Sequence, residues 1–192
     1  MAKQKFLDCM AEVWKNEVWS GNENYVYTKD NYHTKYGIAF EFNEEHLALV
    51  GIFIPEQIKD LTKEQAFEIY YNKYWLNSHA ALLTKDAAYL HFDAAVNQGL
   101  FGAAKMLQEA LNIQMPNGAR KLKIDGKIGP KTKHSANMVT KVHKTDLFDT
   151  YRIIREREYF KTLFERCRKR PDELEGILDD FEKSWVKRLR RI

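Results

Sequence analysis

Apolar residues recur at helical spacing along most of the chain. Near the amino terminus Phe6, Met10 and Val13 follow one another at intervals of four and three residues, and Trp14 widens this stripe. Such spacing is typical of an amphipathic helix that buries one face. We therefore expect a first helix whose buried stripe next reaches Glu17.

Similar patterns predict further helices in the rest of the chain. They are expected over residues 43–50, 62–75, 86–97, 102–111, 131–142, 146–169 and 174–189. Thr62 is placed to begin its helix as an N-cap, with Gln65 in the capping-box position. Residues 19–36 are instead irregular and rich in Asn, Gly, Tyr and Lys, which predicts a long loop or a small β excursion. The predicted fold class is therefore all-α, with at most a very small sheet.

Composition describes an ordinary water-soluble globular protein. Of the 192 residues, 44% are hydrophobic and 30% are charged, which excludes a disordered chain. Cys9 and Cys167 fit neither a zinc-binding nor a redox spacing, so we expect no metal and no other cofactor. No run of about eighteen apolar residues and no signal-like apolar segment occurs, which predicts synthesis in the cytoplasm without stable membrane insertion.

The carboxyl-terminal end is basic. The last eleven residues hold five Lys or Arg residues and one acid, Glu182. Such a patch suits nucleic acid, anionic lipid or an anionic wall polymer, and it equally suits a solvated helix face with cations at a helix C-terminus. No nucleic-acid-binding motif accompanies the charge, so we do not expect nucleic acid as a partner.

Glu17 is the first candidate for chemistry, because it continues an apolar stripe. Burial disfavours a charged carboxylate and raises its pKa, and a glycosidase needs such a group to protonate the leaving oxygen. The alternative is a glutamate at a helix end that reaches into water. The loop that follows supplies Asp30 and Thr34, a second carboxylate and a hydroxyl suited to holding an attacking water.

Several separate blocks resemble the glycoside hydrolase family 108 muramidases, found in phage-type endolysins and in proteins once named secretion activators. That family has a helix ending in E-G-G-Y, a loop with an aspartate, and then T-K-Y-G-I. The corresponding blocks here are Phe6 to Glu17, Tyr25-Val26, Thr34–Ile38, Lys59–Thr62 with Tyr70 and Tyr74-Trp75, Phe92–Asn97 and Asp125–Thr132. The last blocks resemble the peptidoglycan-binding region of the family.

The resemblance implies a lysozyme-like helical fold, with the very small β element in the active-site loop. It implies hydrolysis of the β-1,4 bond between N-acetylmuramic acid and N-acetylglucosamine, with the motif glutamate as general acid. Glu17 matches that glutamate by its spacing from Val13, although Val18 and Trp19 replace the two motif glycines. An alignment on Tyr25 makes Glu23 the second candidate for the acid.

The remaining predicted site residues follow the same resemblance. Catalysis is assigned to Glu17, Asp30 and Thr34, and substrate binding to Tyr25, Tyr36, Asp93 and Asn97. Asp30 is also explained as a turn-forming residue, and Asp93 and Asn97 as residues that hydrogen bond to neighbouring backbone.

We expect residues 1–85 to form the catalytic region and residues 86–192 a helical peptidoglycan-binding region, packed together as one compact unit. The expected partner is the glycan strand of peptidoglycan in the cell wall. We expect the protein to reach the periplasm after release or export, through a holin or a secretion machinery. The alternative function is that of a catalytically inactive, peptidoglycan-binding secretion-accessory protein, which the lost glycines suggest.

Overall fold

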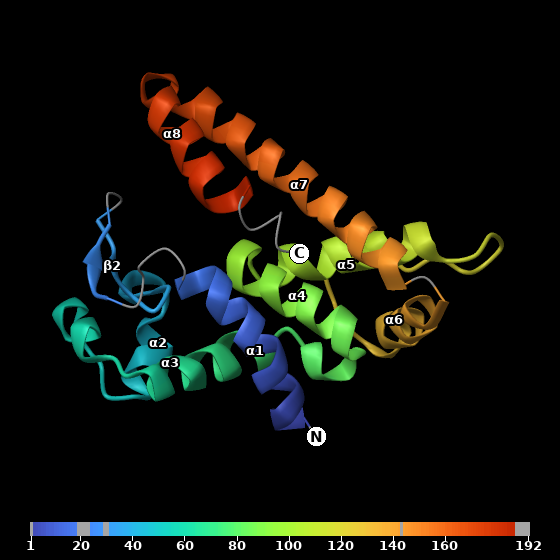
Figure 1. Cartoon of the computed structure of the whole chain (residues 1–192), viewed down its shortest axis with the longest axis horizontal. Helices are drawn as coiled ribbons and strands as arrows, with labels where there is room; N and C mark the ends of the chain where they lie inside the picture. Colours follow the sequence, from blue (N-terminus) through green and yellow to red (C-terminus); the bar gives the residue numbers. More distant parts are fainter. Residues whose placement is uncertain (1, 19–23, 29–30, 143, 187–192) are drawn as a thin grey trace. The chain divides into compact units, whose positions relative to one another are not determined.

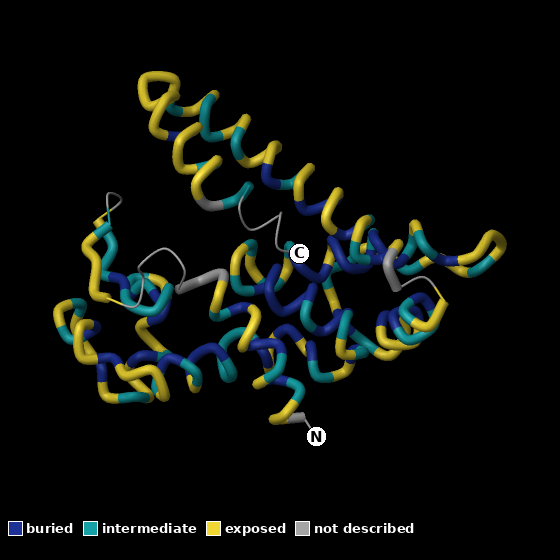
Figure 2. Tube along the Cα trace, viewed as in Figure 1, coloured by how far each residue is buried: buried dark blue, intermediate teal, exposed yellow. Residues whose placement is uncertain are grey.

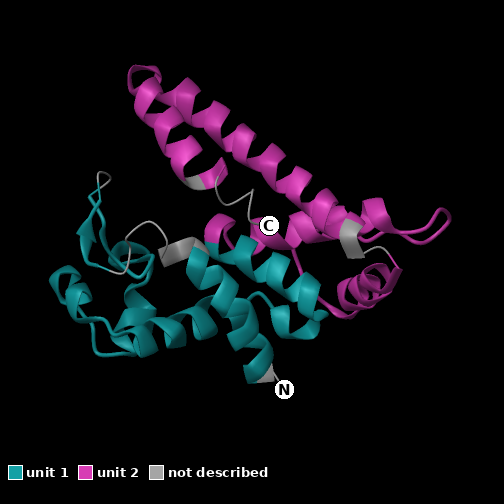
Figure 3. Cartoon of the chain, in the orientation of Figure 1, with its two compact units in different colours: residues 1–96 teal, residues 97–192 magenta. Residues whose placement is uncertain are grey.

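The computed structural model of the chain describes residues 2–18, 24–28, 31–142 and 144–186. The chain divides into two compact units, unit 1 (residues 1–96) and unit 2 (residues 97–192), which Figure 3 shows in different colours. The division falls between residues 96 and 97, whereas the boundary expected from sequence falls after residue 85.

The described chain is mainly helical (Figure 1). The elements of unit 1 are α1 (Ala2–Val18), β1 (Val26–Tyr27), β2 (His33–Lys35), β3 (Ile38–Ala39), η1 (Phe40–Phe42), α2 (Glu44–Ala48), η2 (Pro55–Asp60), α3 (Lys63–Ile69), η3 (Tyr70–Leu76), η4 (Ala80–Leu82) and most of α4 (Lys85–Gln98). Those of unit 2 are α5 (Leu100–Gln114), α6 (Pro130–Val142), α7 (Lys144–Lys169), η5 (Pro171–Glu173), α8 (Leu174–Asp180) and η6 (Phe181–Val186). The prediction of an all-α fold with a very small β element is confirmed.

The predicted helix start at Thr62 is also confirmed. Its side-chain oxygen accepts a hydrogen bond from the backbone N–H of Gln65, and the Gln65 side chain accepts one from the backbone N–H of Thr62. This reciprocal pair is a capping box. The helix then continues beyond α3 as the π-helical segment η3, where the prediction has one uninterrupted helix.

Aromatic packing forms the core of unit 1. Phe6, Met10 and Val13 of α1 are buried, as their spacing predicts (Figure 2). The Phe6 ring meets the rings of Trp75 and Phe92 edge to face, with centroid distances of 5.6 and 5.9 Å. Trp75 and Phe92 are themselves fully buried. The apolar stripe of α1 is therefore held by residues from η3 and α4.

Helices α5 and α7 form the main packing contact of unit 2, and α6 packs against both. Leu107 and Tyr151 are fully buried. Arg155 is also fully buried, and it donates hydrogen bonds to the Gln98 side-chain oxygen at 3.0 Å and to the Tyr159 hydroxyl at 2.9 Å. These hydrogen bonds offset the loss of water around the guanidinium, because a buried charged group is costly unless it is hydrogen-bonded.

The two cysteines occupy different environments. Cys9 lies on the buried face of α1, and burial, reinforced by the neighbouring Asp8, raises its pKa to about 12. Cys167 lies in α7 and is partly exposed. Within the described ranges, no helix combines the length and apolar character that a membrane span requires.

Candidate functional site

The block Thr34–Ile38 forms a tight β-hairpin. Strands β2 and β3 pair antiparallel, with Lys35 opposite Ile38, and Tyr36 and Gly37 make the two-residue turn between them. Both turn residues have positive φ, 52° and 74°, as a type I′ hairpin turn requires. Thr34 lies within β2 and is buried, also pairing with Val26 of β1. The predicted catalytic threonine is therefore fixed in a three-stranded sheet.

Side chains from other elements hold this hairpin in place. The Tyr70 hydroxyl donates a hydrogen bond of 3.0 Å to the carbonyl oxygen of Tyr36, and the Lys35 ammonium donates one of 2.5 Å to the carbonyl of Lys59. The Tyr36 ring lies against the Trp14 ring of α1, with a centroid distance of 5.4 Å. The hairpin turn is therefore anchored to η2, η3 and the carboxyl-terminal half of α1.

Glu17 belongs to the last turn of α1. Its backbone follows fully buried Val13 by four residues and Trp14 by three, so its Cα continues the helix face that meets Tyr36. Its side chain lies outside the described part of the structure. Glu23 and Asp30 also lie outside the described residues.

An ion pair joins the hairpin to η1. The Glu41 carboxylate lies 2.8 Å from Nδ1 of His33 and also accepts hydrogen bonds from the His33 backbone N–H at 3.0 and 3.2 Å. Burial opposes ionisation of Glu41, but these bonds together outweigh it and lower its pKa. Glu41 is therefore a carboxylate kept in its charged form beside the sheet.

Exposed aromatic rings surround that pair. Tyr25 and Tyr27 are 41% and 55% exposed, and their ring centroids lie 6.2 and 4.8 Å from that of His33. Phe42 is 60% exposed and meets the Tyr32 ring at 4.8 Å. We call Tyr25, Tyr27, Tyr32, His33 and Phe42 the aromatic hairpin surface. Rings of this kind present apolar faces and polar edges together, which suits the C–H faces and hydroxyls of a sugar.

The two predicted substrate contacts on α4 have different surroundings. Asp93 is fully buried in unit 1, so a direct contact with glycan requires its neighbours to move. Asn97 belongs to unit 2 and is exposed, and its side-chain oxygen accepts a hydrogen bond from the Tyr159 hydroxyl. The structure therefore does not present the two side chains on one exposed surface.

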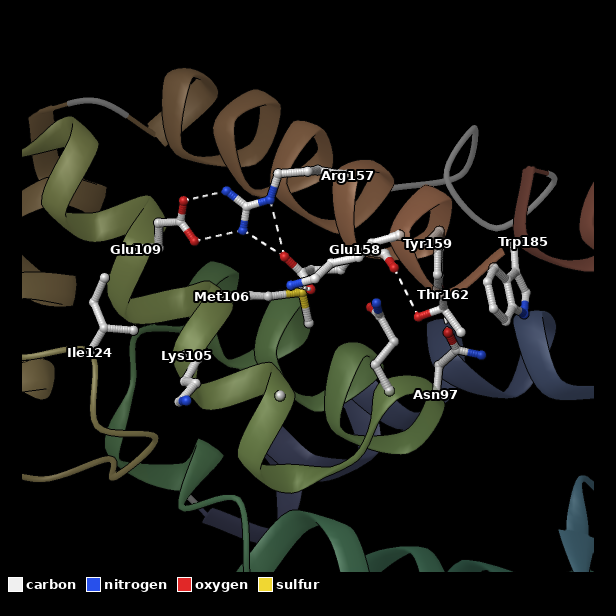
Figure 4. A pocket seen from close by; sticks show the side chains of 13 residues that line it. Asn97, Lys105, Met106, Glu109, Ile124, Arg157, Glu158, Tyr159, Thr162 and Trp185 are labelled. Carbon is white, nitrogen blue, oxygen red and sulfur yellow. Dashed lines mark hydrogen bonds and ion pairs between the residues drawn. The ribbon is translucent and has the colours of Figure 1, made fainter. Parts of the chain in front are cut away.

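Asn97 lies at the edge of a pocket of about 580 Å³ in unit 2 (Figure 4). Arg157 lines this pocket and forms a bidentate ion pair with the Glu109 carboxylate, at 2.6 and 2.8 Å. It also forms an ion pair with the Glu158 carboxylate at 2.7 Å. The bonds from Arg157 lower the pKa of Glu109. Trp185 stacks on Tyr159 at 4.7 Å on another side of the pocket. Arg157, Glu109 and Glu158 therefore largely neutralise one another's charge.

The described residues contain no group of three or more side chains arranged to hold a metal ion. The part of the basic carboxyl-terminal end from residue 187 onward lies outside the described residues. Candidate chemistry in unit 1 therefore depends on the end of α1 and the hairpin.

Sequence reasoning missed the His33–Glu41 pair and the role of Tyr27. The partners of the pair belong to different elements, β2 and η1, so the periodicity of a single helix or strand does not bring them together. A signal did exist for Tyr27, because Tyr25 and Tyr27 alternate around Val26 as residues on one face of a strand do.

Two family matches follow one another along the chain. Glycosyl hydrolase 108 matches residues 20–99, and a predicted peptidoglycan domain matches residues 102–190. The first range contains Glu23, Asp30 and Thr34, and begins three residues after Glu17. Together the matches assign a peptidoglycan-related function, with the cell wall as its place of action.

A comparison with curated proteins gave no significant match. Among solved structures, that of SagA from Brucella abortus is similar, with 24% identity and a TM-score of 0.63. The similarity covers 98% of this chain and 91% of the SagA chain, and it shows a shared fold. The chain thus carries, in the order expected from the sequence, a region that matches glycosyl hydrolase 108 and a region that matches a predicted peptidoglycan domain.

Proposed function

We propose that the protein is an N-acetylmuramidase, which hydrolyses the β-1,4 bond between N-acetylmuramic acid and N-acetylglucosamine. One observation carries the proposal beyond the family match: the hairpin with the T-K-Y-G-I block packs through Tyr36 on Trp14, one turn before Glu17. This packing supports a general acid at the end of α1, next to a hairpin that carries exposed aromatic rings.

In this mechanism Glu17 protonates the leaving glycosidic oxygen. Its place after fully buried Val13 favours a partly desolvated carboxyl group, and desolvation raises a carboxyl pKa toward the range of a general acid. Asp30 acts as the second carboxylate, and Thr34 helps to orient the attacking water. Glu23 is the alternative acid, since it lies inside the family match.

The glycan strand binds along the aromatic hairpin surface. Tyr25 is exposed there and stacks on a sugar face, while Tyr36 lines the site from the turn. Asp93 is fully buried in unit 1 and supports this surface from the core of that unit. No metal or organic cofactor takes part in this mechanism.

A second function is favoured by one departure from the motif. Val18 and Trp19 stand where the family has two glycines. The protein would then bind peptidoglycan without cleaving it, as an accessory of secretion. In either function, access to the wall is provided by a holin or a secretion machinery.

Digestion of purified peptidoglycan tests the proposal. The wild type should release muropeptides with reducing-end muramic acid, identified by mass spectrometry. Glu17→Gln should lower the rate by about 10²–10⁴-fold, because a general acid contributes a factor of that size. Asp30→Asn should also reduce the rate.

Two further variants make the result specific. Glu12→Gln changes the same residue type on an exposed position of α1 and should leave the rate unchanged. Loss of activity in Glu23→Gln, with activity kept in Glu17→Gln, would assign the acid to Glu23 instead. A folded wild type that binds peptidoglycan but releases nothing would refute the muramidase and support the accessory role.

A further inference from the structure

Unit 2 contains a second, larger pocket with a marked excess of positive charge. It has a volume of about 970 Å³ and lies between the loop over residues 115–129 and helix α6. We call it the basic pocket. Its charged lining consists of Arg120, Lys121, Lys123, Lys127, Lys131 and a single carboxylate, Asp125.

The negative charge in the basic pocket is already engaged by the protein. The Asp125 carboxylate accepts hydrogen bonds from the Gln108 amide at 2.8 Å and from the backbone N–H of Lys127 at 3.0 Å, and these bonds lower its pKa. Among the described residues, Lys123 and Lys131 make no salt bridge. The positive charges around the pocket therefore exceed what the described protein groups neutralise.

The loop that carries these cations is held in a defined shape. Gln108, which is 2% exposed, donates to Asp125 and to the carbonyl of Lys127, and its oxygen accepts from the backbone N–H of Gly126. Asn112 makes a similar reciprocal pair with the backbone of Leu122. A binding surface ordered before the ligand arrives loses less conformational entropy on binding.

Part of the lining of the basic pocket is apolar. It includes Met115, Leu122, Ile128 and Met138, of which Met115 and Ile128 are buried. A matching ligand therefore combines carboxylates with short aliphatic groups. A neutral sugar chain lacks the charge, and a phosphate polymer lacks the aliphatic part.

We infer that the basic pocket binds the peptide stem of peptidoglycan through the carboxylates of that stem. The stem is the part of peptidoglycan that carries free carboxylates next to alanine methyl groups and an aliphatic diamino acid chain. The inference rests on the proposed function only in taking peptidoglycan as the ligand. It assigns the glycan to unit 1 and the stem peptide to unit 2.

Calorimetric titration of the full-length protein with a soluble disaccharide tetrapeptide tests this inference. The disaccharide N-acetylglucosaminyl-N-acetylmuramic acid lacks the bond that a muramidase cleaves, so binding is measured whether or not the protein is an enzyme. The same compound with amidated carboxylates should bind about tenfold more weakly, and the peptide-free disaccharide more weakly still. Higher salt should weaken binding of the carboxylate form most.

Matched variants locate the site. The triple variant Lys123→Gln, Lys127→Gln and Lys131→Gln should lose about tenfold in affinity for the tetrapeptide compound, since each exposed charge pair contributes only modestly to binding.

The control triple variant is Lys133→Gln, Lys141→Gln and Lys169→Gln. It removes the same net charge from exposed positions of unit 2 that do not line the pocket, and it should bind as the wild type does.

Several results would overturn the inference: no measurable binding by the wild type, equal losses in both triple variants, or equal affinity for the peptide-free disaccharide. Inorganic polyphosphate that displaces the tetrapeptide compound and binds more tightly would instead indicate a phosphate-polymer site. Stem binding without hydrolysis would leave the inference standing while the muramidase proposal failed.

Discussion

The amide of Gln108 provides the sharpest stability test. It makes three hydrogen bonds to the turn over residues 125–127, at 2.8, 2.9 and 2.9 Å, from a position that is 2% exposed. The variant Gln108→Met keeps the length of the side chain and its helix propensity but removes all three bonds. Because volume is nearly conserved, no large cavity contributes to the change.

Each of those bonds contributes roughly 0.5–1.5 kcal/mol net, and the turn groups left behind regain some water. We therefore expect Gln108→Met to lower the free energy of unfolding by about 2–3 kcal/mol. Urea denaturation followed by circular dichroism measures this, with an unchanged denaturant slope showing that the unfolded state is the same. Asp125→Ala removes only one acceptor of the Gln108 amide and should have the smaller effect.

A loss below about 0.5 kcal/mol in Gln108→Met would refute the idea that this side chain holds the turn, since even one buried bond contributes that much. A larger effect of Asp125→Ala than of Gln108→Met would contradict it as well. A stable turn is also a condition for the basic pocket, so stem-peptide affinity should fall together with stability in Gln108→Met.

Two further predictions concern unit 1. Thr62→Ala removes the N-cap acceptor of the Gln65 N–H and should cost about 1 kcal/mol in thermal or chemical denaturation; an unchanged midpoint would contradict the capping role. The pKa of Glu41 is lowered from its ordinary 4.5, so its pair with His33 stabilises the folded state above that value and loses this effect as pH falls through the lowered folded pKa. Glu41→Gln should therefore be less stable than the wild type near neutral pH, by about 0.5–1 kcal/mol for a partly exposed pair, and this difference should shrink as pH falls through the lowered folded pKa of Glu41; a difference that stays constant in acid would argue against the pair.

Periodicity was sufficient for long helices such as α1 and α5, because each of them buries an apolar stripe. Phe6, Met10 and Val13 are all buried as their spacing predicts. The start of α3 was also predictable, since the capping box of Thr62 and Gln65 is a local pattern that depends on no distant contact.

The hairpin and the pockets depend on contacts that periodicity does not encode. Tyr36 adopts a positive φ that non-glycine residues rarely take, and the fold imposes it through the turn to Gly37 and the hydrogen bond from Tyr70. The pairing of His33 with Glu41 and the gathering of cations around the basic pocket likewise arise from loop conformation. The T-K-Y-G-I block was found through family resemblance, which carries information about such loops that a single pattern lacks.

The unequal environments of the two thiols have a practical consequence. With a pKa of about 12 and 2% exposure, Cys9 forms almost no thiolate near neutral pH, and the thiolate is the form that alkylating reagents attack. Cys167, partly exposed on α7, is then the one site that a maleimide dye modifies in the folded protein. The native chain can thus be given a single fluorophore on unit 2 without mutagenesis, which allows single-molecule observation of its residence on intact cell walls.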